Sequence, residues 1–153
     1  MVKEESYKWS LKQVQVQIKR HTNIVATLAN TAAILKERFP NYFWVGFYFL
    51  EGRELILGPF QGPPACMRLS LDSGVCATAV NEKKTIIVPD VHRFEGHVAC
   101  DSRSNSEIVV PGFNTRNEIK MVLDIDSEKL DTFNETDKKY LEIITEKLKR
   151  IWQ

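Results

Sequence analysis

Apolar residues recur at helical spacing in two segments of the chain. The first segment runs from Ile24 to Leu35, and Pro40 follows its end. The second segment begins after Asn134, a good N-cap residue, and carries Asp137 in its first turn. Its apolar stripe comprises Tyr140, Leu141, Ile144, Leu148 and Ile151. The pattern predicts one helix toward the N-terminus and another at the C-terminus.

Between these helices the apolar runs shorten to the length of strands. The expected strands are residues 42–50, 54–60, 85–89, 107–111 and 118–125. Residues 51–54 and 113–118 are typical of hairpin connections. A short helix is expected after Ser73, carrying Val75 to Val80. The order predicts an α+β domain over residues 1–153: a mainly antiparallel sheet of about six strands with helices packed on it, including N- and C-terminal helices.

Composition narrows the class of protein. The 153 residues include 21 basic and 20 acidic side chains, so no strongly basic face indicates binding of nucleic acid. The longest apolar runs are too short to span a bilayer, and the N-terminus lacks the features of a signal peptide. Three cysteines are an odd number, which favours free thiols in a reducing compartment. We therefore expect a cytosolic protein.

Candidate chemistry gathers between Val88 and Pro111, where Cys100 lies near His92, His97 and Glu107. A reactive thiol needs partial exposure and a neighbour that handles protons. His97 favours a thiolate at Cys100 and Asp101 opposes it. Spacing alone leaves a nucleophile and a structural thiol as equal alternatives.

The other two cysteines have different surroundings. Cys66 follows a stiff Gly-Pro-Pro-Ala loop, whereas Cys76 lies among small apolar residues and is expected to be a buried structural thiol. No pair has the spacing of a zinc finger or ribbon. A mixed zinc site with His92 and His97 is therefore disfavoured.

Strand alternation places two further sets of side chains. One face of the first strand carries Trp44, Gly46 and Tyr48. The glycine leaves a slot between the two aromatic side chains, which suits the wall of a pocket. The alternative is that the two aromatics pack under a helix. Asp124 and Asp126 share one face about 7 Å apart. Two close carboxylates need a proton or a cation, such as a bound ammonium group, unless the strand ends there and they face water.

Six strings in this order, WVGFY, LGPFQGPPAC, GVC, VPDVH, GHVACDSRSNSEIVVP and VLDIDS, resemble those of the free methionine-(R)-sulfoxide reductases. These enzymes are built on a GAF domain, and the likeness runs from about Asn41 to the final helix. The resemblance implies reduction of free methionine sulfoxide, with thioredoxin as reductant, no cofactor or metal, and a homodimer. It gives no role in nucleic-acid or membrane binding.

The resemblance also implies roles for individual residues. Cys100 matches the catalytic cysteine that becomes a sulfenic acid, and Cys66 the resolving cysteine that forms a disulfide with it. Cys76 matches a third cysteine that assists resolution or replaces Cys66 in it. Trp44 and Tyr48 match aromatics that enclose the substrate methyl group.

Three acidic residues complete the implied site. Glu107 is the expected principal proton donor to the sulfoxide oxygen, and Asp126 assists it. A remaining carboxylate, with Asp124 in the set, would pair with the substrate ammonium. That pairing explains a preference for free methionine, because a peptide-bonded residue has no α-ammonium.

The chain departs from the family pattern at three positions. Met121 stands where a glycine is expected, Gly112 where an apolar residue is expected, and Ala77 where a glycine is expected. Met121 is expected to alter packing beside the aspartates. The alternative function is a GAF module that binds a ligand or senses redox state without turnover. The complete cysteine set and the expected absence of an output segment favour the enzyme.

Overall fold

The structure is a computed structural model that describes residues 2–152. Its helices are α1 (Val2–Lys19), α2 (Ile24–Arg38), α3 (Val75–Glu82) and α4 (Glu135–Leu148), with 3-10 turns η1 (Val91–Arg93) and η2 (Lys149–Ile151). Its strands are β1 (Trp44–Glu51), β2 (Glu54–Gln61), β3 (Arg68–Ser70), β4 (Ile86–Val88), β5 (Ser106–Phe113) and β6 (Ile119–Ser127).

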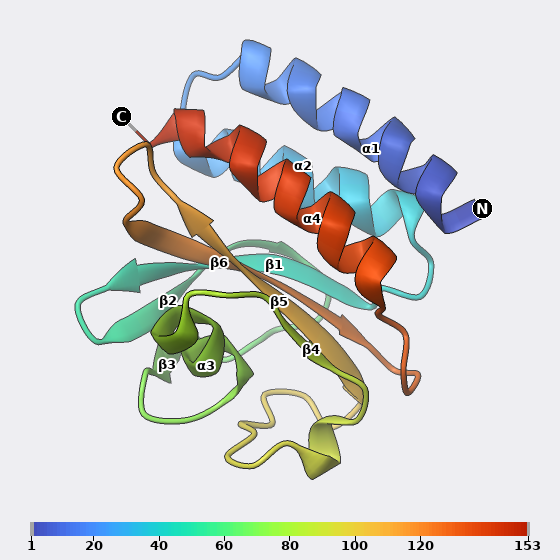
Figure 1. Cartoon of the computed structure of the whole chain (residues 1–153), viewed down its shortest axis with the longest axis vertical. Coiled ribbons are helices and arrows are strands. Elements are labelled where there is room, and N and C mark those ends of the chain that lie inside the picture. Colours follow the sequence, from blue (N-terminus) through green and yellow to red (C-terminus); the bar gives the residue numbers. More distant parts are fainter. Residues whose placement is uncertain (1, 153) are drawn as a thin grey trace.

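The strands form one six-stranded sheet in the order β3-β2-β1-β6-β5-β4 (Figure 1). Every neighbouring pair is antiparallel. The predicted α+β class with an antiparallel sheet is confirmed, as are helices near both termini. The two central strands, β1 and β6, carry the predicted aromatic and acidic residues side by side.

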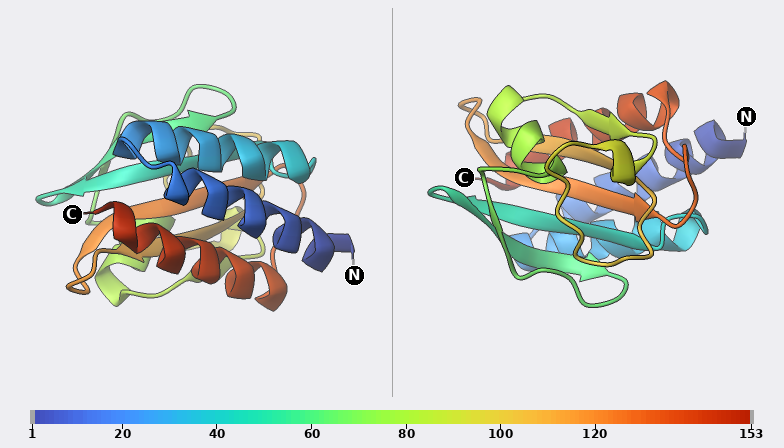
Figure 2. Two further views of the ribbon diagram at one scale, coloured as in Figure 1. Left: turned by 90° about the horizontal axis from the view of Figure 1, so that it is seen from above. Right: turned by 90° about the horizontal axis from the view of Figure 1, so that it is seen from below.

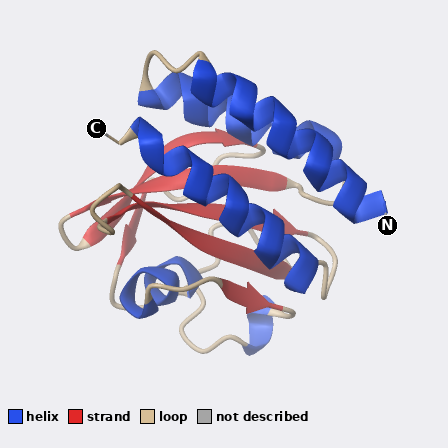
Figure 3. Ribbon diagram, turned by 45° about the horizontal axis from the view of Figure 1, so that its top comes forward, coloured by secondary structure: helices blue, strands red, loops and turns tan. Residues whose placement is uncertain are grey.

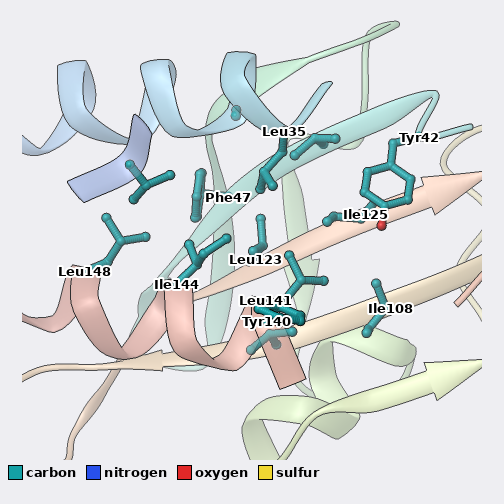
Figure 4. Close-up of a cluster of buried hydrophobic side chains, with 14 of the residues drawn as sticks. Leu35, Tyr42, Phe47, Ile108, Leu123, Ile125, Tyr140, Leu141, Ile144 and Leu148 are labelled. Atoms are coloured by element: carbon teal, nitrogen blue, oxygen red, sulfur yellow. The ribbon is translucent and has the colours of Figure 1, made fainter. Parts of the chain in front are cut away.

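Helices α1, α2 and α4 cover one face of the sheet (Figures 1 and 3). The apolar stripe predicted for the last helix faces this core, and Tyr140, Leu141, Ile144 and Leu148 pack there with Leu123 and Ile125 of β6 (Figure 4). Helix α3 and the long loop after β4 lie on the opposite face (Figure 2). Because side chains alternate along β6, Val122 and Asp124 point toward α3 while Leu123 and Ile125 point toward the large helices.

The cap predicted for α4 also anchors α1. Asn134 and Asp137 form a capping box, in which each side chain accepts from the backbone near the other. Asp137 is fully buried, and its Oδ1 accepts hydrogen bonds from the hydroxyls of Tyr7 (2.5 Å) and Tyr42 (2.7 Å). Lys3 Nζ lies 2.7 Å from its Oδ2. One carboxylate thus joins α1, the turn that precedes β1, and α4.

Several element boundaries differ from the sequence prediction. The sequence prediction gave no bounds for helix α1 or for the short strand β3. Strand β1 begins at Trp44 and not at Tyr42, because Tyr42 closes a turn on Phe39 and points into the helix-side core. Strand β6 continues through Asp126 to Ser127, so the alternative in which the strand ends at the aspartates is wrong. No helix within residues 2–152 has the length and apolar character needed to cross a membrane.

Candidate active site

A pocket opens on the α3 side of the sheet, over the centre of β1, β6 and β5. The predicted site residues that line it are Trp44, Tyr48, Cys76, Cys100, Glu107, Asp124 and Asp126. Cys66 does not itself line the pocket, but it is joined to Cys100 at the rim, and its neighbours Pro64 and Ala65 contribute to the wall. Residues that are distant in sequence therefore meet at one place.

The aromatic wall differs in detail from the predicted slot. A Cβ atom at position 46 would meet the Trp44 ring and would lie 2.5 Å from Phe60 Cβ. The Trp44 ring therefore lies across Gly46 and stacks on Phe60, with ring centroids 5.3 Å apart. The glycine accommodates the tryptophan and does not leave an open space. Tyr48 completes the wall, its ring centroid 6.0 Å from that of Trp44.

The polar ends of these two aromatics hold the loop that carries Cys66. Tyr48 Oη donates a 2.8 Å hydrogen bond to the carbonyl oxygen of Cys66. Trp44 Nε1 donates to the carbonyl oxygen of Pro63 at 3.0 Å. Buried Tyr and Trp side chains usually place their polar atoms against such partners. The proline-rich loop is thereby tied to β1 on both sides of its stiff segment.

Cys66 and Cys100 form a disulfide, with Cα atoms 5.4 Å apart. The pairing implied by the family resemblance is thus present in the structure. Cys76 is free and buried on α3, as its apolar neighbours predicted. Burial, reinforced by Asp124, Glu107 and Asp126, raises the pKa of its thiol. A thiol in this state is a poor nucleophile at neutral pH.

The three acidic residues occupy neighbouring positions on β5 and β6. Glu107 is the direct cross-strand partner of Asp126, and Asp124 lies opposite Val109, two residues farther along β5. Burial raises the pKa of Glu107, and the charges of Asp124 and Asp126 raise it further. Burial likewise raises the pKa of Asp124 and of Asp126. Carboxyl groups in this arrangement retain protons at a pH where exposed ones are ionised.

One oxygen in the cluster has no partner. Asp124 Oδ1 is buried and accepts no hydrogen bond from the residues that the structure describes. An unsatisfied buried oxygen is costly, so this atom is suited to receive a donor from a ligand. The carboxyl groups of Glu107 and Asp124 also lie close to the thiol of Cys76, near enough for the three to share a cation.

The loop after β4 contributes two further polar side chains to the site, and sequence reasoning gave no role to one of them, Ser104. Ser104 Oγ donates to Asp126 Oδ1 at 3.0 Å, and His97 Nε2 lies 3.9 Å from Glu107 Oε1. Burial lowers the pKa of His97, which favours its neutral form. No local pattern marks Ser104, because its partner is 22 residues away.

Two further polar residues of the run after Val88, His92 and Asp101, make contacts within the loop. His92 Nε2 lies 2.9 Å from Asn105 Oδ1, where it orders the loop outside the pocket. Asp101 is held by Arg103, which keeps the pKa of that carboxyl at about 2. Among the described residues, the potential ligand atoms gathered around Cys76 belong to Glu107 and Asp124 and include neither His92 nor His97.

The departure at position 121 lies on the other face of the sheet. Met121 is fully buried in the helix-side core and is the cross-strand partner of Gly112. Its side chain therefore points away from Asp124, which lines the pocket. The expectation that the Met121 side chain alters packing beside the aspartates is wrong, because the two lie on opposite faces of β6.

Comparisons with known proteins agree with this geometry. The GAF domain family model matches residues 21–152. A free methionine-R-sulfoxide reductase of Escherichia coli K12 is 47% identical over 130 residues, which are 85% of this chain and 78% of that protein. "GAF domain-containing protein A" of Dictyostelium discoideum is 52% identical over 140 residues, 91% of this chain and 87% of its own.

A solved structure matches the whole fold. The free methionine-R-sulfoxide reductase of Neisseria meningitidis, solved in complex with its substrate, superimposes with a TM-score of 0.94 at 45% identity. The match covers 98% of this chain and 90% of that one.

Proposed function

Because the chain belongs to the free methionine-R-sulfoxide reductase family of GAF-domain proteins, we propose that it reduces free L-methionine-(R)-sulfoxide to L-methionine. The observation that carries the proposal is the Cys66–Cys100 disulfide at the rim of a pocket floored by three acidic residues. Each step of such a reduction has a candidate group within this site.

Cys100 is the nucleophile in this account. Its thiolate attacks the sulfoxide sulfur, and the S–O bond of the substrate breaks while an S–O bond to Cys100 forms. The substrate sulfur gains two electrons and leaves as the thioether of methionine. Cys100 loses two electrons and becomes a sulfenic acid. The exposure of Cys100 at the pocket rim supports this role, because an incoming sulfoxide has access to it.

Glu107 supplies the proton that the sulfoxide oxygen needs as it becomes more basic. A donor must be protonated at the working pH, and burial together with the neighbouring carboxylates raises the pKa of Glu107, which favours this state. Asp126, its cross-strand partner, assists by sharing the proton. The hydrogen bond from Ser104 keeps the Asp126 carboxyl in place.

Asp124 is the best candidate for the substrate ammonium. Within residues 2–152 its Oδ1 lacks a hydrogen-bond partner and lies at the pocket floor, and no described Lys or Arg lines the pocket to compete for it. A methionine sulfoxide residue within a peptide has no charged amine to offer. It would leave Asp124 unsatisfied, and this selects the free amino acid. Trp44 and Tyr48 form the apolar wall against which the methyl group packs.

The catalytic cycle closes through thiols. Cys66 attacks the sulfenic acid of Cys100, which releases water and forms the disulfide. A dithiol of the thioredoxin class then reduces the disulfide and is itself oxidised. Cys76 remains a reduced thiol through this cycle; its buried, protonated state supports an assisting role over that of the primary resolving cysteine.

Coupled oxidation of NADPH by thioredoxin reductase and thioredoxin tests the proposal. We expect turnover with the R epimer of free methionine sulfoxide and none with the S epimer or with the N-acetylated amino acid. Asp124→Asn should raise KM for the free amino acid. Tight binding of the sulfoxide without turnover would overturn the proposal and favour a ligand-sensing module.

A further inference from the structure

Three potential metal ligands converge at the floor of the pocket from three different elements. They are the Sγ atom of Cys76 on α3, a carboxylate oxygen of Glu107 on β5 and one of Asp124 on β6. All three residues are buried, and the ligand atoms lie within 4.8 Å of one another. We propose that this cluster is a binding site for a thiophilic divalent cation, Zn²⁺, which would fill the pocket in place of the amino-acid substrate.

His97 is a nearby nitrogen ligand just outside this group. Its side chain is only 16% exposed, lines the same pocket, and brings Nε2 to 3.9 Å from Glu107 Oε1. In a tetrahedral zinc site with bonds of about 2.0–2.3 Å, neighbouring ligand atoms are roughly 3.3–3.8 Å apart. The 3.9 Å between His97 and Glu107 is close to this range, but His97 lies outside the group of Cys76, Glu107 and Asp124. Those three residues therefore supply the thiolate and the two carboxylates, and His97 would complete the site only by moving toward the ion.

The unpartnered Asp124 Oδ1 is independent support for a cationic ligand. Asp124 is only 7% exposed, and none of the described residues that line the pocket around its side chain is a Lys or Arg. The substrate ammonium is one cation that satisfies this oxygen. Zn²⁺ is a second cation that would satisfy it, and the Cys76 thiol favours zinc in particular. Sulfur adds little to ammonium binding but is a preferred ligand of zinc.

The ligand types also exclude the common hard cations. Mg²⁺ and Ca²⁺ take six or more oxygen ligands, many of them from water, whereas this site is buried and contributes sulfur. Spacing along the sequence could not indicate the site, since Cys76, Glu107 and Asp124 belong to no local motif. Binding of the ion displaces the thiol proton of Cys76 and is therefore weaker at low pH.

The disulfide state allows a selective test. When Cys66 and Cys100 are joined, Cys76 is the one thiol left among the three cysteines of the sequence. Diamide-oxidised protein is titrated with Co²⁺ as a spectroscopic substitute for zinc. We expect one Co²⁺ per chain, a thiolate-to-cobalt charge-transfer band, the visible bands of a tetrahedral site, and displacement of cobalt by Zn²⁺.

Variants identify the ligands. Cys76→Ser should remove the charge-transfer band, and Glu107→Gln and Asp124→Asn should each weaken cobalt binding about tenfold or more while the band persists at saturation. Glu51→Gln removes an exposed carboxylate at the end of β1 and should change nothing. Absence of the band in oxidised wild-type protein would overturn the inference. Undiminished cobalt binding in both Glu107→Gln and Asp124→Asn would also overturn it. This second criterion holds even if the Cys76→Ser protein does not fold.

Only the claim that zinc and substrate exclude one another rests on the proposed function. The cobalt titration contains no sulfoxide and needs no turnover. If the protein fails to reduce methionine sulfoxide but gives the band, the reductase proposal fails while the metal site stands.

Discussion

Tyr48 Oη donates a 2.8 Å hydrogen bond to the backbone carbonyl of Cys66. A residue expected only to enclose the substrate therefore also fixes the loop that carries Cys66, the proposed resolving cysteine. With the bond from Trp44 Nε1 to Pro63, it sets where Cys66 stands relative to Cys100. The two aromatic side chains that form the pocket wall therefore also position the Cys66 loop beside Cys100.

Tyr48→Phe should slow disulfide formation and leave substrate binding nearly unchanged. The ring remains in the wall, while one hydrogen bond worth about 1 kcal/mol is lost, which corresponds to roughly a fivefold lower rate of resolution. The measurement is the lifetime of the Cys100 sulfenic acid, trapped with a dimedone probe after one turnover. Tyr140→Phe, which loses a hydrogen bond to Glu4 on the helix side, is the matched control. Equal lifetimes in the two variants would refute the role of Tyr48.

Glu107→Gln should lower kcat by about 100-fold or more, because an amide cannot donate the proton that a carboxylic acid provides. The shape and hydrogen-bonding capacity of the side chain are largely kept, so substrate binding should change much less. The rate of the coupled reductase reaction measures both quantities. Glu51→Gln serves as control for loss of a carboxylate. Turnover close to the wild-type value would show that another group is the donor.

The same substitution should stabilise the protein in a pH-dependent way. The folded-state pKa of Glu107 is raised, so the unfolded chain loses this proton at a lower pH than the folded chain does. Stability of the wild type therefore falls as pH rises above the unfolded-state pKa of a glutamate, about 4.3, until the folded-state pKa is reached.

Glu107→Gln removes that loss. Its unfolding temperature should exceed the wild-type value at pH 8, and the difference should shrink on acidification toward pH 4. Thermal unfolding followed by circular dichroism at several pH values measures the effect. A variant that is less stable than wild type at pH 8 would contradict a protonated, crowded Glu107.

Gly112 and Met121, two positions expected to depart from the family pattern, are cross-strand partners. A Cβ atom at position 112 would lie 2.7 Å from Met121 Cε. Gly112→Val should therefore destabilise the fold by about 1–3 kcal/mol through overpacking, and Met121→Ala by about 2–5 kcal/mol through the cavity it leaves.

The double variant should be more stable than the sum of the two losses predicts, because valine occupies the space that methionine vacates. Urea unfolding of the four proteins of the cycle gives this coupling. KM should stay near the wild-type value, since Met121 faces away from the pocket. Strict additivity would show that the two positions do not compensate.

Local patterns predicted much of the fold and part of the site. Alternation along the strands placed Trp44 with Tyr48 on one face of β1 and Asp124 with Asp126 on one face of β6. The N-cap signal at Asn134 located the start of α4. These features depend on neighbours within a few residues. The local sequence is therefore sufficient to predict them.

Contacts between distant segments could not be predicted in the same way. Asp137 had the signature of a first-turn acid, yet it also binds Tyr7, 130 residues away. Ser104 had no signature, because its role depends on Asp126 across the loop. The slot expected at Gly46 is filled by the Trp44 ring, since strand alternation fixes the side that a residue faces but not its rotamer.

The central claim is that the Cys100 sulfur takes the oxygen from free methionine-(R)-sulfoxide. A single turnover without external reductant tests it most directly, with methionine quantified per chain and the cysteines mapped by mass spectrometry. Fully reduced wild-type protein should yield one methionine per chain and a Cys66–Cys100 disulfide. Cys66→Ser should still yield one methionine, with a sulfenic acid at Cys100. Methionine produced by Cys100→Ser at the wild-type amount would contradict the account.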